Sequence, residues 1–202
     1  MTRREELPAA VSGGRRLADL LDAVDRAGER VFEHTRGHPL ADVLAAGASN
    51  LSDYGLVWVL LAIVKARRPG RARRRAVAGL ALAGVLSYGV NRAVKQRVGR
   101  ERPAGREERV RAALAVRRPA SSSFPSGHTL AACCTAVVLT DGAGTAAALG
   151  FAAAVALSRV HLGDHHLSDV VGGGLIGGVL GIVARALLDR VVAPEHAGTV
   201  AE

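Results

Sequence analysis

Three short stretches of this chain carry residue types that are suited to chemistry on a phosphate ester. They cover residues 95–103, 125–128 and 158–169. Among their residues are two imidazoles, three cations, a carboxylate and a glycine whose spacing matters for the argument: His128, His165, Lys95, Arg102, Arg159, Asp169 and Gly127. Cations and backbone N–H groups can hold a phosphate, and a histidine can attack it.

The third stretch contains His165 and Asp169, which are four residues apart and would share one face of a helix. A carboxylate bonded to one ring nitrogen fixes the tautomer and leaves the other nitrogen free to attack. The alternative is an ordinary His–Asp pair at the start of a helix. The pair alone does not decide between them.

The second stretch has the order Pro-Ser-Gly-His and precedes an apolar segment. Ser126 and Gly127, at a helix N-terminus, can offer backbone N–H groups to an anion. His128 can give a proton to a leaving oxygen. A plain helix cap would explain the serine, but it does not require the other three residues.

The first stretch is basic and follows an apolar segment. Lys95 and Arg102, joined by Arg159 from the third stretch, could clamp phosphate oxygens. Arginine suits bidentate contacts, and lysine acts as a point charge. Basic residues beside an apolar segment are more often a solvated flank, and we assign Arg97 and Arg100 to such a flank.

Taken together, the stretches follow the pattern Lys, six residues, Arg-Pro; Pro-Ser-Gly-His; and Ser-Arg, five residues, His, three residues, Asp. This pattern resembles the signature of the type 2 phosphatidic acid phosphatase family, which shares its site with vanadium-dependent haloperoxidases. The resemblance is detailed over residues 95–169. It departs at Leu167, where a proline is common, at residues 104–105, where a second Arg-Pro is common, and at Asp164, whose charge would oppose a phosphate.

The resemblance implies a role for each matching residue. His165 would be the nucleophile and form a phosphohistidine, Asp169 would orient it, and His128 would be the general acid and later the base. No metal and no cofactor would be needed. His161 and His166 would be bystanders. The phosphate-binding residues would be Lys95, Arg102, Ser126, Gly127 and Arg159.

The surrounding sequence predicts an all-α, integral-membrane helical bundle in one domain, residues 14–192. Of the 202 residues 49% are apolar, and the formal net charge is +9. Residues 14–32 have the spacing of an amphipathic helix, and the two ends, 1–13 and 193–202, are predicted to be disordered. A soluble bundle of alanine-rich helices is the alternative. The five expected spans are residues 43–64 (with Asp53 as the only charge), 76–94, 128–140, 142–158 and 167–188.

If these five segments alternate in direction, all three stretches lie on one side of the membrane. The basic loop 65–75 lies on the other side and should be cytoplasmic. The active site is therefore expected outside the cytoplasm, although the many arginines on its own side argue against this. The fifth segment has glycines four apart, which predicts close packing within the chain or, alternatively, a homodimer.

The leading hypothesis is a membrane phosphatase acting on a lipid phosphate. Candidate substrates are phosphatidate-like lipids, or polyprenyl carriers with a phosphate, diphosphate or phosphoribose. One alternative is a vanadate-dependent haloperoxidase. Another is a non-catalytic membrane transporter or anionic-lipid binder. Nucleic-acid binding is not expected, because the basic residues are interleaved with apolar segments and not with stacking aromatics.

Overall fold

The computed structural model describes residues 9–103 and 121–192, and within these ranges every regular element is helical. This confirms the predicted all-helical fold. Helix α1 begins at Ala9, inside the range predicted to be disordered, whereas residues 1–8 and 193–202 lie outside the described part. The elements are α1 (Ala9–Glu33), α2 (Pro39–Ser52), the 3-10 turn η1 (Asp53–Gly55), α3 (Leu56–Ala66), α4 (Arg71–Val98), α6 (Gly127–Leu139), α7 (Ala143–His161) and α8 (Leu167–Val191).

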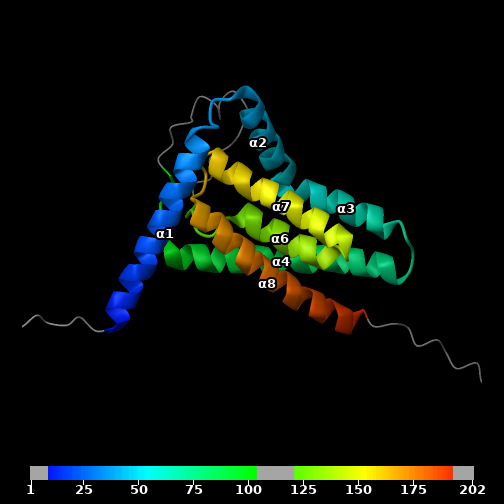
Figure 1. Cartoon of the computed structure of the whole chain (residues 1–202). Coiled ribbons are helices and arrows are strands. Elements are labelled where there is room, and N and C mark those ends of the chain that lie inside the picture. Colours follow the sequence, from blue (N-terminus) through cyan, green and yellow to red (C-terminus); the bar gives the residue numbers. More distant parts are fainter. Residues whose placement is uncertain (1–8, 104–120, 193–202) are drawn as a thin grey trace, which may run out of the picture.

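Helix α6 lies at the centre of the bundle, with α3, α4, α7 and α8 around it (Figure 1). Its sequence is rich in small side chains, and Ala132, Cys134 and Ala136 are fully or almost fully buried. Small residues let neighbouring helices approach closely. The centre of the bundle is therefore held largely by close approach of the helix backbones, with Trp58 of α3 and Phe151 of α7 packed beside Ala132 and Ala136.

Glycines of α8 make the closest of these approaches. Gly173, Gly177 and Gly181, four residues apart, all face α6, and a Cβ added at Gly177 would lie 2.2 Å from the carbonyl oxygen of Leu130. No side chain fits in that space. The predicted small-residue stripe is thus used for packing within the chain.

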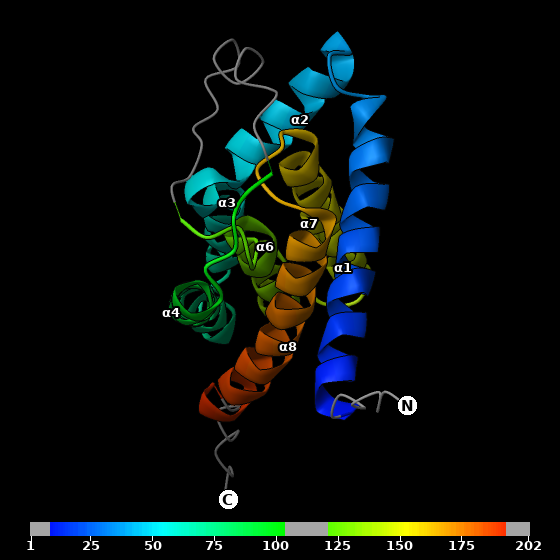
Figure 2. The same ribbon diagram turned by 90° about the vertical axis from the view of Figure 1, so that its left-hand side faces the viewer.

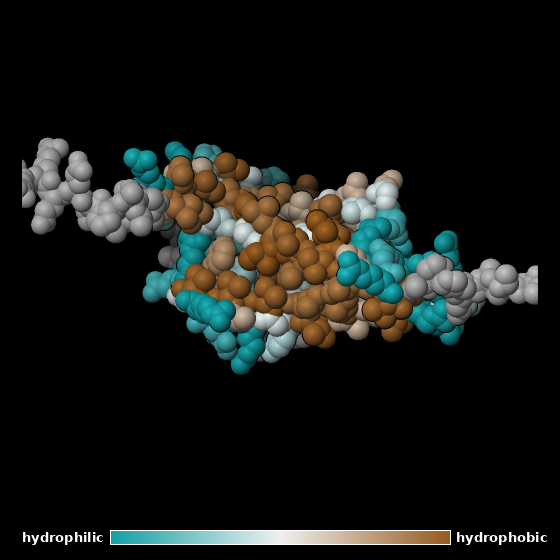
Figure 3. Space-filling model, turned by 90° about the horizontal axis from the view of Figure 1, so that it is seen from below, coloured by the Kyte–Doolittle hydropathy of each residue, from teal (hydrophilic) through white to brown (hydrophobic). Residues whose placement is uncertain are grey.

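The outside of the bundle is apolar enough for lipid. Figure 3 shows a hydrophobic band between hydrophilic ends, and α8 exposes Leu175, Val179 and Ile182 by more than 60% each. By length and composition, α4, α7 and α8 can each cross a bilayer, and the bent α2–α3 pair adds a fourth candidate. Helix α6 has 13 residues, or about 20 Å, less than the hydrocarbon thickness of about 30 Å. Because other helices enclose α6, its ends can contact protein, and it does not need to cross the whole hydrocarbon layer as a lipid-facing helix must.

The first predicted span is not one helix. It is interrupted at η1, where Gly55 has a left-handed φ of 68°, and α2 and α3 meet there at 55°. The apolar run concealed this break, because only Asp53 marks it in the sequence. The break places that carboxylate beside the N-terminal end of α6.

The three stretches with chemical potential meet at one end of the bundle. They are the end of α4, the start of α6 and the connection from α7 to α8, and α1 lies across this end (Figure 2). Helix α4 stops at Gly99, whose φ of 59° turns the chain back toward the site. The basic loop between α3 and α4 lies at the opposite end (Figure 1).

Candidate active site

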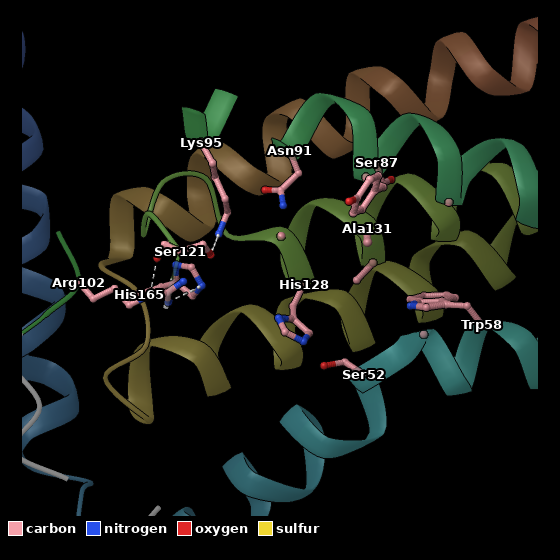
Figure 4. A pocket seen from close by; sticks show the side chains of 15 residues that line it. Ser52, Trp58, Ser87, Asn91, Lys95, Arg102, Ser121, His128, Ala131 and His165 are labelled. Carbon is pink, nitrogen blue, oxygen red and sulfur yellow. Dashed lines mark hydrogen bonds between the residues drawn. The ribbon is translucent and has the colours of Figure 1, made fainter. Parts of the chain in front are cut away.

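A cavity of about 370 Å³ opens between α3, α4, α6 and the α7–α8 connection. Its lining includes five of the eight predicted site residues, and Figure 4 shows both histidine rings and the Lys95 chain in this region. The other three, Ser126, Arg159 and Asp169, are buried behind the lining. The five lining residues are Lys95, Arg102, Gly127, His128 and His165.

The His165 ring is held in a defined orientation. Its Nε2 lies 3.3 Å from Nη1 of Arg102, and a guanidinium can only donate, so Nε2 is the acceptor in this contact. The proton of the neutral ring then belongs on Nδ1, which faces Oδ2 of Asp169 at 3.7 Å. That separation is longer than a direct hydrogen bond. Asp169 therefore acts on the ring through its charge, and a hydrogen bond between the two forms only if the ring moves closer.

The ionisation of His165 suits a nucleophile. Burial lowers the pKa of its ring to about 4, an effect that Asp169 opposes. The cations Arg102 and Arg159 reinforce the lowering because they disfavour an imidazolium beside them. The ring is therefore neutral at pH 7, with a lone pair available on Nε2.

Asp169 is fully buried and is fixed by two bonds. Its Oδ2 accepts from the backbone N–H of His166 at 2.8 Å, and its Oδ1 accepts from Nη1 of Arg100 at 2.7 Å. The assignment of Arg100 to a solvated flank is therefore wrong. No spacing rule distinguished this arginine from its neighbours, since only the fold brings it to Asp169.

Arg100 also ties the site to the N-terminal helix. Its Nη2 donates to Oδ2 of Asp25 on α1 at 2.5 Å. The same carboxylate accepts from the backbone N–H of Ser168 at 2.8 Å and from its hydroxyl at 2.9 Å. Burial alone would lower the pKa of the Arg100 guanidinium, but the bonds to Asp25 and Asp169 outweigh it and raise that pKa. The amphipathic helix thus contributes a carboxylate to the support of the site.

The second histidine has a carboxylate partner of its own. Nε2 of His128 lies 2.8 Å from Oδ1 of Asp53, and the carboxylate must be the acceptor. The sequence did signal Asp53 as the lone charge in an apolar segment, a position where charges are usually functional. No role was predicted for it, because a single charge in an apolar run was not enough to predict the break in the helix.

The two cations on the cavity wall also hold the segment before α6. Lys95 donates to the carbonyl of Ser122 at 2.8 Å and contacts the Ser121 hydroxyl at 3.2 Å. Arg102 donates to the carbonyls of Ser121 at 2.9 Å and of Asp164 at 2.6 Å. They reach the cavity from different segments, α4 and the chain after it, as the clamp hypothesis requires.

Arg159 and Asp164 form a buried ion pair, Nη2 to Oδ2 at 2.6 Å, with exposures of 2% and 0%. Arg159 also donates to the hydroxyl of Ser49 on α2. The sequence suggested that Asp164 would repel a phosphate. Its pairing with Arg159 offsets that charge, while the Arg159 cation still acts on the cavity and contributes to the lowered pKa of His165.

At the start of α6, the backbone N–H of Ser126 donates to the carbonyl of Asp169 at 3.0 Å. That N–H is therefore used within the protein, and the predicted donation from Ser126 to an anion is not seen in this structure. At Gly127 an added Cβ would lie 2.9 Å from Nδ2 of Asn91. The glycine is therefore needed for the close contact with α4. Within the described residues, no three His, Cys, Asp or Glu side chains gather as metal ligands would.

Comparisons with known proteins agree with this geometry. The model of the PAP2 superfamily matches residues 76–192. The chain belongs to the PAP2 superfamily.

Several relatives of this PAP2 protein are phosphatases. The decaprenylphosphoryl-5-phosphoribose phosphatase of Mycobacterium tuberculosis is 30% identical over 148 residues, which cover 73% of this chain and 78% of the relative. The decaprenylphosphoryl-5-phosphoribose phosphatase of Mycolicibacterium smegmatis is 31% identical over 137 residues. These residues cover 68% of this chain and 73% of the relative.

Solved structures share the fold. The transmembrane PAP2 type phosphatidylglycerolphosphate phosphatase of Bacillus subtilis superposes with a TM-score of 0.68 at 23% identity, over 85% of this chain and 88% of that one. LpxE of Aquifex aeolicus superposes with a TM-score of 0.57 at 27% identity, over 77% of this chain and 91% of LpxE. The PAP2 chain described here is a membrane protein and a lipid phosphatase, a hydrolase of phosphoric esters. The haloperoxidase and transporter alternatives find no support.

Proposed function

We propose that this phosphatase removes the terminal phosphate of a polyprenyl-linked phosphosugar, through a phosphohistidine on His165. The observation that carries the catalytic part is the single cavity into which His165, His128, Lys95 and Arg102 all project. The substrate part is supported by the mycobacterial relatives, whose names specify a decaprenyl-linked phosphoribose. Phosphatidate-like lipids are the second candidate class.

In the first step Nε2 of His165 attacks phosphorus and the P–O ester bond breaks. The leaving oxygen takes a proton from His128, and Lys95, Arg102 and the N–H groups at Gly127 balance the charge on the phosphoryl oxygens. The cation of Arg159 and the backbone at Ser126 support this arrangement from behind the cavity wall.

In the second step His128, now neutral, takes a proton from water, and the resulting hydroxide attacks the phosphohistidine. The P–N bond breaks, inorganic phosphate leaves and His165 regains its lone pair. Asp169 stabilises the positive charge that the His165 ring carries while it holds the phosphoryl group.

The test is phosphate release by the purified protein in detergent from three lipids: decaprenylphosphoryl-5-phosphoribose, decaprenyl phosphate and phosphatidate. We expect release from the first at the highest kcat/KM, and a loss of about 10⁴-fold in His165→Ala. His34→Ala is the matched control, because His34 is exposed in the turn that follows α1. Failure of the wild-type protein to release phosphate from any of the lipids would refute the proposal.

We also propose that the chain crosses the membrane several times and that its site faces away from the cytoplasm. Support comes from the basic α3–α4 loop, at the opposite end of the bundle from the site. A cysteine placed at Arg68, in a Cys133→Ala, Cys134→Ala background, should resist an impermeant maleimide in intact cells and react after lysis. Labelling of this cysteine in intact cells would mean that the loop is outside the cell and that the site faces the cytoplasm.

A homodimer through α8 remains a separate proposal. Gly173, Gly177 and Gly181 are covered by α6, so a dimer would have to use another face of α8, such as the one where Gly178 is open. Native mass spectrometry of the detergent-solubilised protein, comparing wild type with Gly178→Leu, should show loss of a dimer. A wild-type monomer at all protein concentrations would exclude it.

A further inference from the structure

A stripe of polar side chains runs along α4 on the wall of the catalytic cavity. Ser87, Asn91 and Lys95 are four residues apart, so they share one helix face, and all three line the cavity. The rest of this segment of α4 is mainly apolar and long enough to cross a bilayer. Polar groups inside such a helix usually mark a ligand path. The proposed mechanism uses only Lys95, so the other two need an explanation.

Neither of these two side chains has its hydrogen bonds completed by the protein. Oδ1 of Asn91 and Oγ of Ser87 are buried and have no hydrogen-bond partner that meets ordinary distances among the described residues. The thiol of Cys134 is near Ser87 but is a weak acceptor. A buried polar atom without a partner destabilises the fold unless water or a ligand satisfies it. Both atoms belong to residues on the wall of a cavity, where a ligand can do so.

The position of Asn91 relates it directly to the reacting phosphate. Its amide packs against Gly127, with Nδ2 2.9 Å from the position of a Cβ added there. Gly127 opens α6 immediately before His128, the proposed proton donor to the leaving oxygen. A group bonded to Asn91 would therefore lie next to the ester oxygen, on the leaving-group side.

Figure 4 shows the order of side chains along the cavity: Lys95 near His165, then Asn91, then Ser87, with Trp58 at the far end. The cavity changes along this line from cationic, through neutral and polar, to aromatic and apolar. A matching ligand has a phosphate, then neutral hydroxyl groups, then an apolar chain.

We propose that Asn91 and Ser87 form a subsite for hydroxyl groups on the alcohol that the reaction releases, a sugar or a glycerol unit between the phosphate and the lipid chain. The Asn91 amide can accept from one hydroxyl and donate to the next, because its terminal torsion is broad. Ser87 can do the same with its single hydroxyl. This subsite rests on the proposed function and adds to it the chemical class of the leaving group.

The experiment compares three substrates: decaprenylphosphoryl-5-phosphoribose (sugar hydroxyls), phosphatidylglycerol phosphate (a glycerol hydroxyl) and decaprenyl phosphate (none). Asn91→Leu should lower kcat/KM by about 100-fold on whichever hydroxylated lipid is used best, and by less than about threefold on decaprenyl phosphate. Ser87→Ala should show the same selectivity with a loss of about fivefold. Asn50→Leu is the matched control, because Asn50 is exposed on α2.

A variant that turns over decaprenyl phosphate is folded. If Asn91→Leu does not fold, Ser87→Ala allows the same comparison among the three substrates. A larger loss on the sugar lipid identifies a sugar, and a larger loss on the glycerol lipid identifies glycerol. Equal losses on all three substrates, or no loss, would overturn this subsite while leaving the phosphatase assignment intact. No phosphate release by the wild type from any lipid would overturn the proposed function and the subsite together.

Discussion

His128 and Asp53 form a 2.8 Å contact although 75 residues separate them in the chain. Burial and the Arg159 cation favour the neutral ring of His128, and the Asp53 carboxylate opposes them by favouring the protonated ring, which is the form that a general acid needs. The second histidine of the cavity is thus supported by a carboxylate, as His165 is by Asp169. His161 and Asp42 form a third pair at 2.8 Å, outside the cavity lining.

We predict that Asp53→Asn slows the release of an alkyl alcohol far more than that of a phenol. A phenolate leaves without a proton, so phosphoryl transfer from a phenyl ester does not need the proton of His128. We compare two chain-matched substrates, a long-chain alkyl phosphate and a long-chain alkylphenyl phosphate, by kcat/KM, which reports phosphoryl transfer and not the later hydrolysis of the phosphohistidine. This ratio should fall by about 10² for the first and by less than about fivefold for the second.

Asp42→Asn is the matched control for this prediction, because it removes the same charge from a His–Asp pair away from the site. It should leave the ratio of the two rates unchanged. Equal losses for both substrates in Asp53→Asn would mean that Asp53 supports the fold only.

The pH response of His165 should follow its surroundings. Because burial and two cations lower the pKa of its ring to about 4, the ring should stay neutral from pH 7 down to near pH 4 and gain its proton below that. An ordinary histidine is protonated near pH 6.5. Ring ¹⁵N chemical shifts, assigned with His165→Gln, should give this midpoint, and Arg102→Gln should raise it. A midpoint near 6.5 in the wild type would contradict the prediction.

At the scale of single elements, helix α1 does more than shield the bundle. Asp25 joins the start of α8 to Arg100, which in turn holds Asp169. A Cβ added to Gly28 would lie 2.8 Å from Cβ of Leu167, so the two helices touch at that point. The apolar face of α1 is largely exposed, including Leu17 and Leu20, as in helices that lie in a membrane interface.

We predict that Asp25→Asn lowers kcat by about 10-fold with KM changed less than about twofold, because a positioning residue acts on the transition state through Asp169. The measurement is steady-state phosphate release in detergent. Asp22→Asn, on the same helix and one turn earlier, should leave kcat within about twofold. A rise in KM alone in Asp25→Asn would assign Asp25 to lipid binding.

The contact between α6 and α8 gives a stability prediction. Gly177→Ala places a methyl group 2.2 Å from the Leu130 carbonyl, whereas Gly178→Ala meets nothing within 4 Å. The first change should destabilise the protein by about 1–3 kcal/mol through overpacking, and the second should be near neutral. Thermal unfolding in detergent should show a lower Tm for the first variant only. Similar Tm values for both would mean that the α6–α8 contact is looser than described.

At the scale of the whole molecule, the site is placed at one end of a membrane bundle. Its residues come from the end of α4, the start of α6, the α7–α8 connection, the break between α2 and α3, and the side of α1. The cavity continues from the cations past α4 and α6 to Trp58. A lipid phosphate could therefore enter with its phosphate at the charged end and its chain toward the apolar bundle.

The sequence by itself determined the helical membrane fold and the five residues that line the cavity. It could do so because apolar periodicity, helix-start residues and the spacing within each stretch are local properties, set by the geometry of a few turns. Long apolar segments of alternating direction also required the three stretches to meet at one end.

Only the tertiary structure decided which residues support the histidines and which further residues, such as Asn91 and Ser87, join the five predicted ones on the cavity wall. The contacts Asp53–His128, Arg100–Asp169 and Asp25–Ser168 cross from one element to another, so their spacing in the chain carries no signal. The break that positions Asp53 lies in an apolar run that reads as one helix. The place of Asn91 beside Gly127 depends on how closely α4 and α6 pack, and that distance is set by small side chains on both helices and by the buried surface between them.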